Sequence, residues 1–220
     1  MNARQSAAAK PSVVADTSES PALANLFLEQ GHATRIELSI PPRADIVFMV
    51  ISGCVKVTAP TSNGTAIVEL CYQGDFVGID TAMAGKRRIT TSARAYRHPP
   101  GVYTLTTNEF KYHLGQSREA LWEVGVLLAA RSYMQTDWRL ENHGPVASRL
   151  ARCLLRIASP ASGEIPVTQA ELAATIGASQ VSAENELRKL RARGIVATGY
   201  GTIVICDRGA LRIMAKPAGP

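Results

Sequence analysis

The sequence has no long hydrophobic run and no targeting segment of the usual kind. No stretch approaches the roughly 18 to 20 consecutive apolar residues that cross a bilayer, and no basic stretch at the N-terminus leads into an apolar one. We therefore expect a cytoplasmic protein without a membrane partner.

Cysteine is scarce, and its spacing excludes the common metal sites. The four cysteines are far apart and form no CxxC or CxxxC pattern, so neighbouring thiols cannot clamp zinc or an iron–sulfur cluster. We expect each of them to be a small buried hydrophobic residue. They are Cys54, Cys71, Cys153 and Cys206.

Histidine is equally scarce. His32, His98, His113 and His143 show no metal-ligand spacing, so we expect no metal site, and only haem ligation is left open. A jelly-roll enzyme of the cupin type would need clustered His and Glu ligands on inward-facing strand positions, and the sequence has no such cluster. We therefore expect no enzymatic activity.

The residues that are present indicate a globular protein with a basic C-terminal third. Of the 220 residues, 46% are hydrophobic and 19% are charged, which is typical of a folded chain with two compact units. Residues 145–220 carry ten Lys or Arg and five Asp or Glu, whereas residues 1–144 carry fourteen and thirteen. This asymmetry suits a module that faces phosphates. The alternative is a basic surface that only confers solubility.

The N-terminal half has the pattern of a β-domain. Residues 1–21 are rich in Ala, Ser and Pro without an apolar period, and we expect a disordered tail there. Short apolar runs then alternate with turn residues such as Asn63-Gly64, which indicates a β-sandwich or barrel over residues 22–116. The expected strands include Ile46–Ile51, Val55–Thr58, Ala66–Leu70 and Val102–Thr106.

A long helix is predicted over residues 117–143. Apolar residues follow its three- and four-residue steps on one face, with Arg131 as a polar interruption, and others such as Trp122 and Tyr133 cover a second face. A helix that is apolar on two faces needs two partners, which we take to be its own β-domain and the same helix of a second subunit. The alternative is a helix that packs only within its own monomer.

Gly144-Pro145 ends this helix and opens a C-terminal unit over residues 144–220. A helix is expected at residues 146–158 and a short extended piece at residues 165–167. After the helices described next, residues 195–206 form a hairpin around Gly199-Tyr200-Gly201.

Between the extended piece and the hairpin lie a capped helix, a tight turn and a second helix. Thr168 and Glu171 make a capping box, and Gly177 can adopt the left-handed conformation that ends the first helix. Ser179 caps the second helix, Gln180–Arg193. Its buried stripe consists of Ala183, Leu187 and Leu190. The pattern predicts a winged helix-turn-helix whose second helix enters the major groove of DNA; a module that makes only protein contacts is the alternative.

The chain resembles the Crp/Fnr family of bacterial regulators from about Arg35 to Leu211. The resemblance rests on Ile51–Val57, Gly74–Gly78, Val146–Arg152, Ile165–Ala173, Leu187–Leu190 and Gly194–Val196. It implies an α+β protein with an N-terminal jelly roll of the cyclic-nucleotide-binding type, a long dimerisation helix and a C-terminal winged helix-turn-helix. The implied function is transcription regulation by a homodimer that binds double-stranded DNA. RNA polymerase would be a further partner of an activator, but the sequence shows no surface for it.

Eight residues are candidates for DNA binding. Gln180 and Asn185 can each bond adenine at two points, and Ser179 and Ser182 lie beside them at the start of the second helix. Thr168, Gln169, Ser179, Arg188 and Lys189 suit phosphates, which position a protein without reading the base sequence. Relatives have arginine and glutamate where this chain has Gln180 and Val181, so the guanine-reading contact of the family is missing.

The residues that correspond to the effector pocket depart from the family pattern. In relatives that bind nucleotides, a glutamate follows Phe-x-Gly and holds the ribose, whereas this chain has Ile79 there and Asp80 one step later. In the same relatives an arginine binds the cyclic phosphate. Arg88 matches that arginine only if the alignment is shifted by one residue. The candidate pocket residues are Gly78, Ile79, Asp80, Arg88, Thr90, Met134 and Gln135. No cofactor is certain, and we expect an effector other than cyclic AMP, or none. A cyclic-AMP-responsive regulator and a degenerate relative that acts through protein partners are the alternatives.

Overall fold

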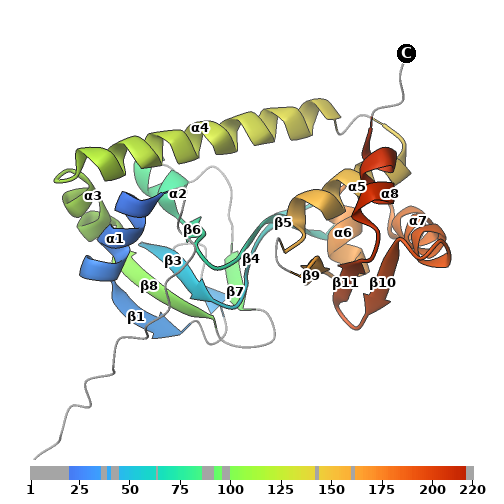
Figure 1. Cartoon of the computed structure of the whole chain (residues 1–220), viewed down its shortest axis with the longest axis horizontal. Helices are drawn as coiled ribbons and strands as arrows, with labels where there is room; N and C mark the ends of the chain where they lie inside the picture. Colours follow the sequence, from blue (N-terminus) through green and yellow to red (C-terminus); the bar gives the residue numbers. More distant parts are fainter. Residues whose placement is uncertain are drawn as a thin grey trace, which may run out of the picture.

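The computed structural model describes residues 20–35, 39–40, 45–62, 64–85, 92–95, 100–141, 144–159 and 162–216 (Figure 1). The tail expected over residues 1–21 falls outside these residues up to position 19. Residue Pro21 begins a helix, α1 (Pro21–Gln30), which the sequence interpretation did not include. No described helix combines the length and the apolar character needed to span a membrane.

The described strands of the N-terminal half form two four-stranded antiparallel sheets, as a jelly roll requires. One has the order β1-β8-β3-β6 and the other β2-β7-β4-β5. The strands are β1 (His32–Arg35), β2 (Ser39–Ile40), β3 (Ile46–Ser52), β4 (Val55–Thr61), β5 (Gly64–Cys71), β6 (Phe76–Val77), β7 (Ser92–Ala95) and β8 (Gly101–Thr106). Alternate residues of β3 and β4, among them Phe48, Val50, Val55 and Val57, pack between the sheets and close the roll.

Four helices cover the other face of the first sheet. They are α1, α2 (Ile79–Ala84), α3 (Thr107–Leu114) and α4 (Arg118–Glu141). Phe27 of α1 lies against Phe76 and Phe110, with ring centroids 5.5 and 5.9 Å away. The carboxylate of Glu123 on α4 accepts hydrogen bonds from the backbone N–H groups of Ala22 and Leu23, at 3.1 and 2.8 Å. This contact satisfies two donors at the free end of α1 and joins it to α4.

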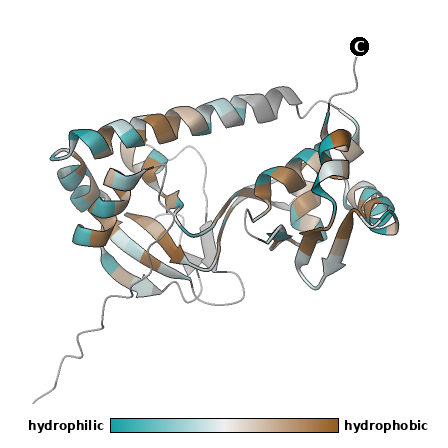
Figure 2. Cartoon of the chain, in the orientation of Figure 1, coloured by the Kyte–Doolittle hydropathy of each residue, from teal (hydrophilic) through white to brown (hydrophobic). Residues whose placement is uncertain are grey.

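Helix α4 packs on the jelly roll with one face only. Ala120 and Val124 are buried in the core, and Leu127 and Leu128 pack against it. Trp122 and Tyr133 are 75% and 73% exposed on the other side. Figure 2 shows the hydrophobic bands of α4 interleaved with hydrophilic ones. A second apolar face therefore has no partner among the described residues.

The C-terminal unit is a set of helices with a small sheet. Its elements are α5 (Val146–Ile157), β9 (Glu164–Ile165), α6 (Gln169–Thr175), α7 (Gln180–Ala192), β10 (Val196–Gly199), β11 (Thr202–Ile205) and α8 (Arg208–Ala215). The described strands pair in the order β10-β11-β9. Extended pairing therefore covers Glu164–Ile165 rather than residues 165–167, since only these two residues pair with β11. Helix α8 was not predicted.

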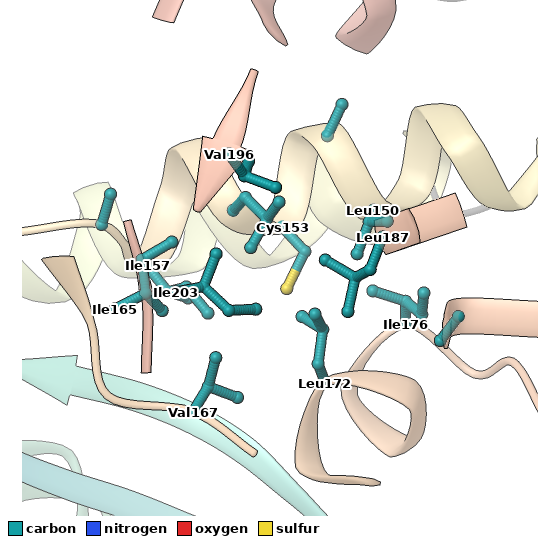
Figure 3. Packing of buried hydrophobic residues seen from close by; sticks show 14 of the residues in the cluster. Leu150, Cys153, Ile157, Ile165, Val167, Leu172, Ile176, Leu187, Val196 and Ile203 are labelled. Carbon is teal, nitrogen blue, oxygen red and sulfur yellow. The ribbon is translucent and has the colours of Figure 1, made fainter. Parts of the chain in front are cut away.

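One apolar cluster holds this unit together. Figure 3 shows Leu150, Cys153 and Ile157 of α5 directed at side chains from the other elements of the unit. Burial raises the pKa of Cys153 to about 11, so its thiol stays uncharged and packs as a hydrophobic group. The expectation that every cysteine is buried is wrong for Cys206, which is exposed. Cys206 lies in the connection between β11 and α8, outside the paired residues of the strand.

The same apolar cluster extends into the jelly roll. Ile67 and Leu70 of β5, together with Cys54, pack against residues of the C-terminal unit that include Leu172. The hydroxyl of Tyr72 donates a hydrogen bond to the carbonyl oxygen of Ile157 at 2.9 Å. The two halves of the chain are thus joined by packed core as well as by α4.

Candidate nucleic-acid interface

The N-terminus of α6 has the predicted capping box. The backbone N–H of Thr168 donates to the Glu171 carboxylate at 2.8 Å, and the N–H of Glu171 donates to the Thr168 hydroxyl oxygen at 3.2 Å. Thr168 is exposed and Gln169 half-buried. Two further N–H groups at this end lack helical partners, as at the start of any helix. This end of α6 therefore favours an anion such as a phosphate.

Glu171 also ties α6 to the jelly roll. Its two carboxylate oxygens accept hydrogen bonds from Lys56 Nζ on β4, at 3.0 and 2.9 Å. The backbone N–H of Ile67 on β5 donates to the Thr175 hydroxyl at 2.9 Å. Burial raises the pKa of Glu171, but the hydrogen bonds from Thr168 and Lys56 outweigh it and leave the pKa below its usual value. The β4–β5 hairpin and the first helix of the motif are consequently joined by side-chain hydrogen bonds from both strands.

The turn between α6 and α7 has the predicted glycine and an additional anchor. Gly177 adopts φ +61°, a conformation that glycine takes without strain. Arg149 on α5 donates to the carbonyl oxygens of Ile176 and Gly177. Ser179 then caps α7 by accepting a hydrogen bond from the Ser182 N–H at 3.2 Å. Arg149 was not among the predicted site residues, although it lies in one of the segments that carry the family resemblance.

Helix α7 is buried on one side and exposed on the other. Ala183, Leu187 and Leu190 are buried, as predicted. Val181 and Asn185 lie about 180° around the helix axis from this buried stripe, and both are exposed. The exposed side of α7 that contains Val181 and Asn185, which we call the crest, is therefore available to a partner.

Two cations of α7, Arg188 and Lys189, are paired within the helix. Arg188 donates to Asn185 Oδ1 at 3.2 Å and lies 3.4 Å from the Glu184 carboxylate. Lys189 Nζ lies 2.7 Å from the Glu186 carboxylate. Pairs of this kind on an exposed helix are weak. The two glutamates therefore reduce the positive field of α7 without preventing Arg188 and Lys189 from turning to phosphates.

A groove separates α6 from the wing. It has a volume of about 320 Å³ and is lined by Thr168, Gln169 and Gln180 on one side and by residues 198–203 on the other. Tyr200, at the tip of the β10–β11 hairpin, is fully exposed. The groove brings three of the predicted site residues to one place. Tyr200 was read only as a turn residue in the sequence, because its exposure depends on how the hairpin projects.

The structure places the predicted effector residues in different surroundings. Gly78 has φ +90°, and a Cβ there would lie 2.8 Å from the Ile46 carbonyl oxygen, so the turn into α2 requires glycine. Ile79 is completely buried in the core beneath α1 and α3. Gln135 is exposed. Arg88 and Thr90, like the side chain of Met134, lie outside the described residues.

Asp80 belongs to an ionic cluster centred on Arg131. Arg131 Nη1 lies 2.8 Å from the Asp80 carboxylate, and Nη2 lies 3.2 Å from the Glu69 carboxylate. Nη2 also donates to the carbonyl oxygen of Phe76 at 2.6 Å. The sequence treated Arg131 as an interruption in an apolar stripe, whereas the fold uses it to attach α4 to the jelly roll. Among the described residues, no group of three or more His, Cys, Asp or Glu side chains could hold a metal ion.

The fold and the interface define a class of protein: a two-part regulator with an N-terminal β-roll, a long connecting helix and a winged helix-turn-helix of the DNA-binding type. Residues 148–214 match the family described as the Crp-like helix-turn-helix domain. The transcriptional regulator SdrP of Thermus thermophilus is 25% identical over 193 residues, which cover 82% of this chain and 89% of SdrP.

Solved structures have the same fold. The c-di-GMP-responsive global regulator CLP of Xanthomonas campestris is 22% identical with a TM-score of 0.63, over 83% of this chain and 97% of CLP. FixK2 of Bradyrhizobium japonicum is 18% identical with a TM-score of 0.62, over 86% and 95% of the respective chains. Residues 148–214 are therefore a Crp-like helix-turn-helix domain, and the chain as a whole has the fold of these solved regulators.

Proposed function

We propose that this chain is a homodimeric, cytoplasmic transcription regulator that binds double-stranded DNA through α7, the N-terminus of α6 and the wing. The observation that carries the proposal is the groove between Thr168, Gln169 and Gln180 on one side and the wing on the other. Gln180, the first residue of α7, is part of its lining. In such modules a helix in the major groove reads the bases, and backbone N–H groups bind phosphates and position the protein.

The exposed face of α4 supports a dimer. Leu121, Trp122 and Val126 are large apolar residues with 48%, 75% and 52% of their surface exposed. They line a hollow of about 900 Å³ along the helix, with Arg118 and Glu119 at its end. A contiguous apolar patch flanked by charges is typical of a protein interface. A second copy of the same helix would cover it, and two-fold pairing would present two copies of α7 to DNA.

We further propose that the effector is not cyclic AMP, or that none is needed. The side chain of Ile79 has no polar atom and is fully buried, so it cannot hold a ribose hydroxyl. Asp80, one step later, is already paired with Arg131. The carboxylate of Asp80 and the guanidinium of Arg131 thus form an ion pair with each other within the chain.

The DNA-binding part is tested with the double variant Gln180→Ala, Asn185→Ala. On duplexes selected from a random library by the wild-type protein, we expect the affinity to fall about 10- to 100-fold, because two base-edge contacts are lost. Fluorescence anisotropy at fixed salt measures it, and Arg212→Ala on α8 is the matched control on an exposed surface. Unchanged affinity of the double variant would contradict base contacts by Gln180 and Asn185, and failure of the wild-type protein to select any duplex would favour a regulator that acts through protein partners. Cyclic AMP should leave the wild-type affinity unchanged.

The dimer is tested with Trp122→Glu. A charge at the centre of the apolar patch should weaken self-association at least about tenfold, because the carboxylate must be desolvated on pairing. Sedimentation velocity over a concentration series measures the shift from dimer to monomer. Tyr112→Glu on α3 is the matched control, since Tyr112 is a similarly exposed aromatic residue, 67%, on another helix. Dissociation by Tyr112→Glu and not by Trp122→Glu would contradict the α4 interface.

A further inference from the structure

The crest of α7 begins with a hydrocarbon side chain. Val181 is 68% exposed and lies on the side of the helix opposite the buried Ala183 and Leu187. Asn185 follows one turn later on the same side. An exposed aliphatic residue thus occupies the leading end of the helix that we propose to enter the major groove.

The neighbours of Val181 are polar. The hydroxyls of Ser179 and Ser182 lie 2.9 Å apart, and Ser179 caps the helix. Gln180 lines the groove beside the wing. Val181 is therefore the first apolar residue on the exposed side of α7.

The chemistry of the major groove leaves one apolar target for such a residue. Base pairs present hydrogen-bond donors and acceptors there, and the apolar feature is the C5 methyl group of thymine. An isopropyl group placed on a donor or acceptor would desolvate it without a replacement bond, at a cost in affinity. Because valine is branched at Cβ, its rotamer in a helix is nearly fixed, so its methyl groups are already in place for contact.

We propose that Val181 is a specificity-determining residue that contacts the methyl group of a thymine in each half-site. The inference rests on the proposed DNA binding by α7 and adds the identity of one base to it. Asn185 lies about 6 Å further along the helix axis, which corresponds to about two base-pair steps. The amide of Asn185 suits adenine, which it can bond at two points. The preferred half-site therefore contains a thymine within about two steps of the adenine read by Asn185.

The test removes single methyl groups from the DNA. Duplexes are selected by the wild-type protein, and each thymine is then replaced in turn by deoxyuridine, which lacks only the C5 methyl. We expect about a fourfold loss of affinity, the factor that matches one buried methyl group, at one thymine per half-site. Val181→Ser should bind the thymine and deoxyuridine duplexes equally, and Val181→Ile should keep the penalty. Because position 181 is exposed, circular dichroism should show both variants folded like wild type.

The outcomes separate this inference from the proposed function. Selection of no duplex at all would overturn DNA binding and, with it, the role of Val181. Selection followed by equal affinity for every deoxyuridine duplex would leave DNA binding intact and overturn the methyl contact. A penalty that persists in Val181→Ser would also overturn it, because another residue would then make the contact.

Discussion

Replacing Arg131 with methionine is expected to lower the free energy of unfolding by about 3 kcal/mol at neutral pH. Arg131 is only 13% exposed and holds the carboxylates of Glu69 and Asp80 at 3.2 and 2.8 Å. Methionine fills much of the same space but leaves the two carboxylates close together without a counter-charge. It also removes one attachment of α4 to the jelly roll, so the self-association that we propose through α4 should weaken as well.

The pH dependence of this loss has a definite sign. Burial raises the pKa of Glu69 above its ordinary value of 4.5, and Arg131 opposes that rise. Without Arg131 the pKa of Glu69 should rise further. A carboxyl whose pKa is higher in the folded than in the unfolded state lowers the free energy of unfolding when the pH is above the pKa of the unfolded state. This loss disappears as the pH falls and the carboxyl becomes protonated. The deficit of Arg131→Met relative to wild type should therefore shrink as the pH falls toward 4.5.

Urea unfolding at neutral and acidic pH and at one protein concentration measures both effects. Arg212→Met, at an exposed arginine on α8, should change the unfolding free energy by less than about 0.5 kcal/mol. Combining Arg131→Met with Glu69→Gln should restore part of the loss, since one buried charge is then removed. A deficit that does not vary with pH would contradict the role of Glu69.

Lys56→Glu is expected to destabilise the contact between the jelly roll and the winged helix by about 3 kcal/mol. Lys56 and Glu171 are 13% and 19% exposed, and their charged atoms lie 2.9 Å apart. The variant replaces this attraction with two carboxylates at a largely buried place. Because Glu171 also caps α6 at Thr168, the disturbance should reach the end of α6 that we propose to bind phosphate and lower duplex affinity about tenfold.

The rescue of this variant distinguishes charge from capping. Glu171→Gln removes the charge and keeps an oxygen that can accept from the Thr168 N–H, as glutamine does in other capping boxes. The pair Lys56→Glu, Glu171→Gln should therefore regain most of the stability. Lys111→Glu on α3 is the exposed control. Hydrogen exchange of the α6 amides reports the contact directly, and unchanged exchange in Lys56→Glu would refute the coupling.

The wild-type contact should also weaken in acid. The pKa of Glu171 is below its usual value of 4.5, so its contribution to stability is present above that pH and is lost as the pH falls through the lowered value. In Lys56→Glu the dependence reverses, because protonation there relieves repulsion. The two proteins should therefore approach each other in stability on acidification.

The helix-turn-helix could be predicted from the sequence because its signals are local. The capping box of Thr168 and Glu171, the left-handed Gly177 and the Ser179 cap each act within four residues. The buried stripe of α7 follows from helical periodicity, which the chain carries in its own spacing. Four of the eight described strands of the jelly roll, β3, β4, β5 and β8, were predicted for the same reason, as alternation between turn residues.

The parts that were missed depend on residues far apart in the chain. Helix α1 is held by Glu123, about one hundred positions later. Arg131 looked like a defect in an apolar stripe until the fold brought Glu69 and Asp80 to it. The expectation of a pocket at Ile79 concerned a side chain that the fold buries completely. No local pattern records such pairings, because they arise when separate elements pack.

The sequence by itself determined the order of most elements and the position and buried side of the second helix of the helix-turn-helix, since capping, turn geometry and apolar periodicity are properties of short segments. Only the tertiary structure decided that Tyr200 at the tip of the wing is exposed and that Lys56 of the jelly roll is bound to Glu171 of the winged helix. Exposure and long-range ion pairing are set by which surfaces meet in the folded chain, and that is a property of the packed whole.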